Sequence, residues 1–166
     1  MLLPPALRIE NLAAAHLDEL ATVLLHPAVC EHIEDELPSL DEFKLGLERA
    51  IAGPAGSAMD ETWLHYLVRD VEGTMLGRPE ATVHHGIAEV AFVFGHRHWG
   101  RGYATAGLRW LHDELARNHA VKACWATTTP ANYRSQALLR RCAYVPAALP
   151  ECPLYSYAPG DLVFRR

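Results

Sequence analysis

A short run of glycine and arginine residues is the part of this sequence whose residue types and spacing could do chemistry. Gly100 and Gly102 flank Arg101, and the whole run reads Arg97, His98, Trp99, Gly100, Arg101, Gly102, Tyr103, Ala104, Thr105. An apolar segment precedes the run and a helical pattern follows it, so we expect a strand, a glycine turn and a helix. The first N–H groups of such a helix lie at the positive end of its dipole, unobstructed by side chains at the glycines. The spacing predicts a phosphate-binding turn, and a plain tight turn is the alternative.

Glu89 is the second candidate, as the one carboxylate in an otherwise apolar strand expected over residues 87–94. Alternation places Glu89 and Val93 on one side of that strand and Phe92 and Phe94 on the other. Burial tends to raise the pKa of a carboxyl towards neutrality, which makes Glu89 a candidate general base. The structural alternative is a glutamate at a strand end that reaches water or pairs with an arginine.

The remaining elements must position these groups. Before the turn we expect an extended segment over 7–10, followed by a helix that Asn11 caps and Pro27 ends. Two more helices should follow, over 29–33 and 40–52, and Ser39 or Asp41 begins the second of them. Strands over 63–69, 74–84 and 87–94 then form an antiparallel meander, in which Pro79 predicts a bulge or an edge. After the turn we expect a helix over 101–118, a strand over 121–126, a helix opened by Asn132 and two closing strands.

Composition narrows the class of protein. A chain of 166 residues is the size of one domain, so we expect residues 1–166 to form a single domain. The net charge of −5 predicts neither nucleic-acid nor membrane binding. The sequence begins without the pattern of a signal peptide, which predicts a cytoplasmic location. The cysteines and histidines show no ligand spacing, which predicts free thiols and no metal site.

Two blocks of sequence resemble one known family. The pattern Arg97-x-x-Gly100-x-Gly102 closely resembles the acyl-CoA signature of the GNAT N-acetyltransferase superfamily, and the block from Asn132 to Val145 is similar to that family's next helix. The resemblance covers most of the chain and is strongest over residues 88–146. It implies an α/β (α+β) fold, with a mixed, mostly antiparallel twisted sheet that is flanked by helices and splayed where acetyl-CoA inserts.

The resemblance also implies roles for particular residues. Acetyl-CoA would be the co-substrate, and Glu89 would deprotonate the amine through water. Acidic residues between the first helices, otherwise a solvated surface, would border the acceptor site. The cofactor-binding residues implied are Phe92, Val93, Phe94, Arg97, His98, Trp99, Gly100, Arg101, Gly102, Tyr103, Ala104, Thr105, Asn132, Ser135 and Arg140.

The sequence departs from the family at the group that protonates the departing thiolate. Many members carry a tyrosine seven residues after the asparagine, where this chain has Leu139. Tyr133 is the nearby candidate for this catalytic role, although it lies one residue past Asn132 and on a different face of the helix. Cys142 is a weaker candidate, and water is the alternative.

We therefore predict acetyl transfer from acetyl-CoA to a primary amine, by direct attack in a ternary complex. The sequence looks most like the branch that contains ribosomal-protein alanine N-acetyltransferases, so the acceptor is either a protein N-terminus or a small-molecule amine. One alternative is a non-catalytic acyl-CoA-binding module. The other alternative is a nucleotide-binding domain, but this sequence lacks the alternating order of strands and helices that such a domain needs. Homodimerisation is left open.

Overall fold

The computed structural model describes residues 5–55 and 60–166, so the start of the chain, on which the expectation about a signal peptide rests, lies partly outside it. In the described residues, strands form one sheet in the order β1-β2-β3-β4-β5-β7-β6. The strands are β1 (Arg8–Asn11), β2 (Thr62–Arg69), β3 (Met75–His84), β4 (Ile87–Phe94), β5 (Cys124–Thr128), β6 (Val145–Pro146) and β7 (Leu162–Arg165). The helices are η1 (Ala14–His16), α1 (Leu17–Leu24), α2 (Pro27–Cys30), α3 (Leu40–Ala52), η2 (His96–His98), α4 (Tyr103–Asn118) and α5 (Tyr133–Arg141).

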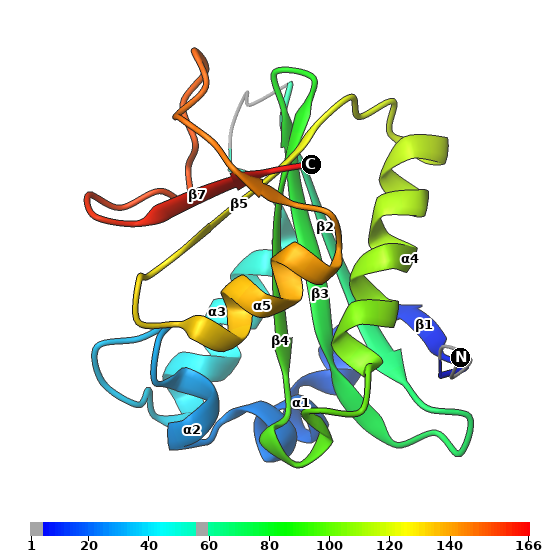
Figure 1. Cartoon of the computed structure of the whole chain (residues 1–166). Coiled ribbons are helices and arrows are strands. Elements are labelled where there is room, and N and C mark those ends of the chain that lie inside the picture. Colours follow the sequence, from blue (N-terminus) through cyan, green and yellow to red (C-terminus); the bar gives the residue numbers. More distant parts are fainter. Residues whose placement is uncertain (1–4, 56–59) are drawn as a thin grey trace.

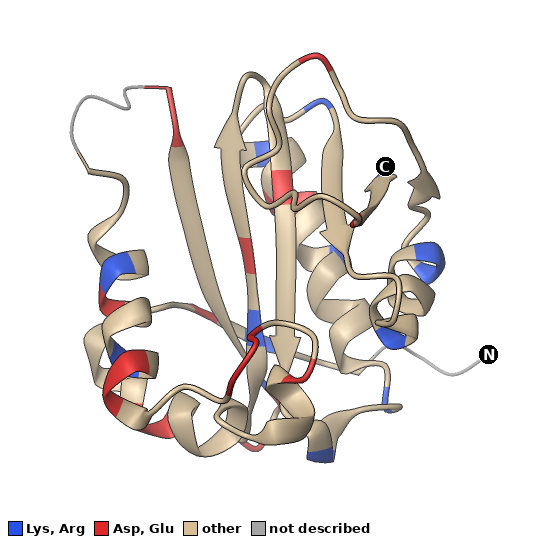
Figure 2. Ribbon diagram, turned by 90° about the vertical axis from the view of Figure 1, so that its left-hand side faces the viewer, with Lys and Arg blue, Asp and Glu red and all other residues tan. Residues whose placement is uncertain are grey.

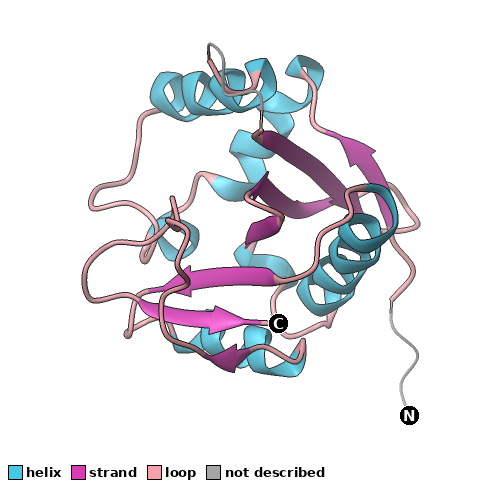
Figure 3. Cartoon of the chain, turned by 90° about the horizontal axis from the view of Figure 1, so that it is seen from above, coloured by secondary structure: helices cyan, strands magenta, loops and turns pink. Residues whose placement is uncertain are grey.

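Helices cover both faces of this sheet (Figures 1 and 3). The apolar face of α4, with Leu108 and Leu111 fully buried, packs on Ala88 and Val90 of β4. On the opposite face, Leu20 of α1 belongs to a second apolar cluster together with residues of α3, β2 and β3. Every strand pair is antiparallel except β4 with β5. The mixed, mostly antiparallel sheet predicted from the sequence is confirmed.

The sheet opens between β4 and β5. These strands pair only at Ala88–Cys124 and Glu89–Trp125. Beyond that contact β4 continues against β3 alone and β5 continues against β7 alone, and Figure 1 shows the two strands diverging. The N–H of Ala88 donates to the Ala123 carbonyl on the β5 side of β4. Because backbone groups alternate along a strand, those of Val90 and Phe92 point to this same side, where β5 is no longer paired with β4.

Several helix boundaries match the sequence and others do not. Ser39, one of the two residues predicted to begin α3, is its N-cap and forms a complete capping box with Glu42. Asn11 was expected to cap the first helix, but this prediction is wrong, because Asn11 is the last residue of β1 and His16 is the N-cap of α1. Pro27 was expected to end the first helix, but α1 ends at Leu24, and Pro27 begins α2, since the first position of a helix needs no N–H donor.

Pro79 also differs from expectation. It does not lie on an edge, because β3 is an internal strand. Its backbone pairs with Phe92 of β4, whereas the ladder towards β2 runs from His65–Glu80 to Val68–Gly77 without the pairs between. The missing N–H of proline thus falls where the ladder is interrupted, so the predicted irregularity is confirmed and the predicted edge is wrong.

No helix in the described ranges is long enough and apolar enough to cross a lipid bilayer.

Candidate active site

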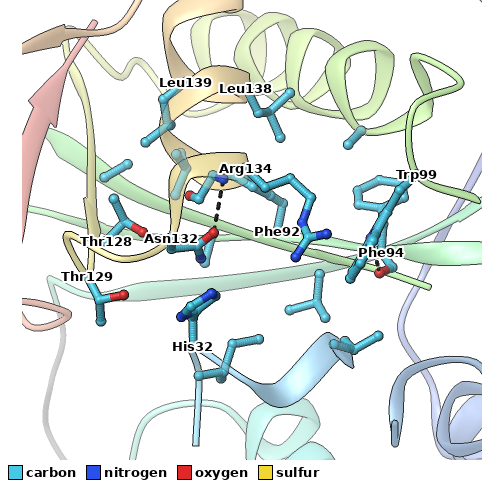
Figure 4. A pocket seen from close by; sticks show the side chains of 18 of the residues that line it. His32, Phe92, Phe94, Trp99, Thr128, Thr129, Asn132, Arg134, Leu138 and Leu139 are labelled. Atoms are coloured by element: carbon cyan, nitrogen blue, oxygen red, sulfur yellow. Dashed lines mark hydrogen bonds between the residues drawn. The ribbon is translucent and has the colours of Figure 1, made fainter. Parts of the chain in front are cut away.

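A cavity of about 950 Å³ occupies the opening between β4 and β5. Its walls come from β3, β4, β5, the glycine turn, the start of α5 and the segment after α2 (Figure 4). Most of the predicted cofactor-binding residues meet there, although far apart in the sequence. Those that line the cavity are Phe92, Val93, Phe94, His98, Trp99, Gly100, Gly102, Tyr103, Ala104, Thr105, Asn132 and Ser135.

The glycine turn has the predicted geometry. Gly100 and Gly102 adopt φ angles of 75° and 81°, in the left-handed region that favours glycine, and Gly102 is the N-cap of α4. The N–H of Ala106 donates to the Gly102 carbonyl over 3.0 Å. The N–H groups before Ala106 therefore precede the helical hydrogen bonds of α4 and lie at the positive end of a 16-residue helix. This arrangement suits an anion.

Asn132 caps α5 on the other side of the cavity. Its Oδ1 accepts a hydrogen bond of 3.1 Å from the N–H of Ser135, so the predicted cap is confirmed. Nearby, the Gln136 side-chain amide donates to the Pro130 carbonyl over 2.9 Å and holds the turn between β5 and α5. The start of α5 is thereby fixed against the end of β5.

Arg134 connects the two sides of the cavity, and the sequence analysis missed it. Its guanidinium carbon lies 3.4 Å from the centre of the Trp99 ring, while the Trp99 indole N–H donates to the Phe94 carbonyl over 2.9 Å. Figure 4 shows Arg134 extending from the start of α5 towards Trp99. Its position two residues after the capping Asn132 is the sequence signal that could have identified it.

Besides Glu89, four predicted site residues do not line the cavity. They are Arg97, Arg101, Arg140 and Tyr133. Arg140 instead lies 5.6 Å from the ring of Phe164, and its neighbour Arg141 lines the cavity. Tyr133 is 77% exposed, so the structure gives no support to its predicted catalytic role. Leu139 is fully buried at the cavity wall and brings no proton donor there.

Glu89 is buried beside the cavity and does not line it. Its Oε1 accepts from the Ser156 N–H at 2.9 Å and hydroxyl at 2.7 Å, and its Oε2 accepts from the Tyr155 N–H at 2.8 Å and His84 Nε2 at 2.5 Å. Burial raises the pKa of Glu89, but the hydrogen bonds from Ser156, Tyr155 and His84 outweigh it, and the net pKa is lowered. The predicted upward shift is therefore wrong. The observed contacts fasten the segment before β7 to the sheet.

The cavity contains other carboxylates that the sequence analysis did not single out as catalytic. Glu80 of β3 lines it together with Arg78, and Glu31, Glu34 and Asp35 line it from the segment after α2. Figure 2 shows acidic residues in that segment. No group of three His, Cys, Asp or Glu side chains in the described parts of the chain could hold a metal ion.

Comparisons with known proteins agree with this architecture. The family model described as an acetyltransferase (GNAT) domain matches residues 6–145. No curated protein sequence matches the chain. Among solved structures, a GNAT-family acetyltransferase from Bacillus anthracis is similar with a TM-score of 0.76 and 12% identity, over 96% of this chain and 93% of that one.

Two further structures with bound ligands are similar. The ribosomal L7/L12 alpha-N-protein acetyltransferase RimL in complex with coenzyme A has a TM-score of 0.75 and 16% identity, over 96% of this chain and 93% of that one. Spermidine N-acetyltransferase from Vibrio cholerae in complex with CoA and spermine has a TM-score of 0.70 and 16% identity, over 96% and 92%. The fold of this chain is that of these acetyltransferase structures. With the family match across most of its length, the chain belongs to the GNAT family of acetyltransferases.

Proposed function

We propose that this protein transfers an acetyl group from acetyl-CoA to a primary amine, within a ternary complex and without a covalent enzyme intermediate. The observation that carries the proposal is the edge of β4 beyond Glu89, which no strand of the described residues pairs with, beside the start of α4 in one cavity of about 950 Å³. An exposed strand edge can pair with the amides of an extended ligand, and a helix start can bind phosphate. The pantetheine arm and the diphosphate of CoA have that order of groups.

Each part of the cavity would have a separate task. The backbone of Phe92 would pair with the pantetheine arm and offer an N–H to the developing oxyanion. The turn from Gly100 to Thr105 would hold the diphosphate, and Asn132 would reach the arm from the start of α5. The segment after α2 would border the acceptor. The similar proteins described as acting on spermidine and on ribosomal L7/L12 support an amine acceptor.

Thermal unfolding with acetyl-CoA, CoA, ATP and NAD tests the cavity assignment. A ligand that binds only the native state stabilises it by about 2.7 kcal/mol at about a hundredfold excess over Kd. We expect stabilisation by the two CoA compounds and none by ATP or NAD. If no CoA compound stabilises the protein at millimolar concentration, the proposal is wrong.

The alternative of a non-catalytic acyl-CoA-binding module has one observation in its favour, the buried Leu139 where many members carry a tyrosine. Solvent can protonate the thiolate in its place, because the cavity is open to water. Release of CoA thiol in the presence of acetyl-CoA and a panel of primary amines separates the two functions. The catalytic proposal predicts release that depends on the amine, whereas a binding module gives stabilisation by acetyl-CoA and no release.

A further inference from the structure

Glu80 lies on β3, the strand next to β4 on the side away from the opening, and its side chain lines the cavity. It pairs in register with Ala91 of β4, two residues past the last contact of β4 with β5. Because paired residues of an antiparallel ladder share a face, Glu80 lies on the same face as Ala91 and Val93. That face is covered by α1, α2 and α3, whereas α4 packs on the other. Glu80 therefore lines the cavity from the side opposite to the start of α4.

The two oxygens of the Glu80 carboxylate differ in their contacts. Oε2 lies 3.2 Å from His65 Nδ1 and 2.5 Å from Arg78 Nη1. Oε1 has no hydrogen-bond partner among residues 5–55 and 60–166. The contrast with Glu89 is direct, since both oxygens of Glu89 already accept two hydrogen bonds each. Glu80 thus combines a fixed position with a free acceptor atom.

The charges around Glu80 favour a cation in this part of the cavity. Burial raises the pKa of Glu80, but the charge of Arg78 and the hydrogen bond with His65 outweigh it, so the net pKa is lowered and the carboxylate is ionised at neutral pH. Arg78 neutralises one negative charge. Four more acidic side chains line the cavity, and they are Glu31, Glu34, Asp35 and Asp161. The other basic or titratable lining residues are His32, His98, Tyr103, Arg134 and Arg141, so the carboxylates, with Glu80, outnumber the three arginines.

We propose that Oε1 of Glu80 binds the protonated amine of the acceptor and selects cationic alkylamines as substrates. This inference rests on the proposed acetyl transfer. The bound ammonium loses one proton to solvent water, and its neutral nitrogen then attacks the acetyl carbonyl. The C–N bond forms, the C–S bond breaks, and the second nitrogen proton passes to the CoA thiolate. Glu80 thereby positions the nitrogen but does not keep its proton.

The test compares Glu80→Gln with the matched control Glu72→Gln, which makes the same chemical change in the exposed turn between β2 and β3. The acceptors are spermidine, n-butylamine, a peptide beginning with alanine, and aniline, which is neutral at pH 7.5. For the cationic acceptors we expect Glu80→Gln to raise KM by roughly ten- to a hundredfold and to leave kcat within about threefold, because a hydrogen bond between charged groups is lost. Glu80→Asp should recover part of the loss, and stabilisation by acetyl-CoA should be unchanged.

Several outcomes would overturn the inference. An unchanged KM in Glu80→Gln, a loss confined to kcat, or a wild-type preference for aniline would each contradict a cation-binding role. If Glu80→Gln does not fold, the salt dependence of KM in the wild type tests the inference. High salt should raise KM for spermidine and not for aniline, and an equal effect on both would overturn the inference. Absence of thiol release with every amine would instead contradict the proposed acetyl transfer itself, and the inference would fall with it.

Discussion

Two glutamates on neighbouring strands show how the same side chain takes different tasks. Glu89 accepts hydrogen bonds at both oxygens from His84, Tyr155 and Ser156 and is 6% exposed, whereas Glu80 has one oxygen without a partner in the described chain. A carboxylate whose lone pairs are occupied cannot also take a proton from substrate without breaking those bonds. We therefore infer a structural task for Glu89, and its catalytic role stays a prediction from the sequence.

This assignment predicts that Glu89→Gln destabilises the fold. The amide of glutamine turns a donor towards groups that are themselves donors, and each unsatisfied buried N–H costs about 1–3 kcal/mol. We expect urea denaturation to show a loss of at least about 2 kcal/mol, against a change within about 0.5 kcal/mol for Glu72→Gln. A variant with wild-type stability and a greatly reduced kcat would instead support the catalytic base expected from the sequence.

The same carboxylate gives a pH dependence. The folded pKa of Glu89 is lowered from its usual 4.5, so its stabilising contribution is present above about pH 4.5 and is lost as the pH falls through the folded value. The difference in unfolding free energy between wild type and Glu89→Gln should therefore shrink below pH 4.5. Urea titrations at pH 7, 5 and 3.5 measure it, and a constant difference would contradict the account.

At the scale of elements, two positions require glycine for different physical reasons. A Cβ at Gly77 of β3 would lie 2.3 Å from the Val93 carbonyl oxygen and 2.7 Å from Phe94 Cα, both backbone atoms of β4. A Cβ at Gly100 would meet nothing within 4 Å, but the residue has a φ of 75°. The first glycine permits close contact of strands, and the second permits a backbone conformation.

We therefore expect Gly77→Ala to cost more than about 3 kcal/mol, because β3 and β4 must separate, and Gly100→Ala about 1–2 kcal/mol, the usual cost of a left-handed residue with a side chain. Chemical denaturation of both variants checks this order. Equal losses would show that the β3–β4 contact adapts to a methyl group.

Elements whose signals are local could be predicted from the sequence. The start of α3 at Ser39, the cap at Asn132 and the turn at Gly100 and Gly102 each depend on residues within a few positions of one another. The partners of Glu89 lie 66 and 67 residues away in an irregular segment, so no pattern near Glu89 indicates them. The alternation of residues in β4 predicted the face on which Glu89 lies, but it did not indicate which segment covers that face.

The candidate site follows the same rule. The glycine turn and Asn132 could be assigned to one site because the two blocks that contain them resemble the same family. Glu80 lies in a different strand and has no motif around it. Its importance comes from the register between β3 and β4 and from the point where β4 and β5 separate. Register and splay are tertiary properties, and for that reason the sequence analysis missed this residue.

At the scale of the whole molecule, a buried histidine links α4 to the segment after α5. His112 Nε2 lies 2.8 Å from the Tyr144 hydroxyl, and both side chains are buried. Burial, with a smaller effect from Arg166, lowers the pKa of His112 from 6.5 to about 4. The unfolded chain therefore binds a proton at this residue between those values, whereas the folded chain does not.

Because the folded pKa is the lower one, the stability due to a neutral His112 is complete above about pH 6.5 and is lost as the pH falls towards 4. A shift of this size corresponds to roughly 3 kcal/mol in global stability. His96 and His98 also have lowered pKa values, so the wild-type curve contains their contributions too. The informative quantity is the difference from His112→Gln, which cannot titrate and keeps an acceptor for Tyr144. Between pH 7 and 5 the wild type should lose more unfolding free energy than this variant. Parallel curves would contradict the account, because they would mean that His112 takes up its proton equally in the folded and the unfolded chain.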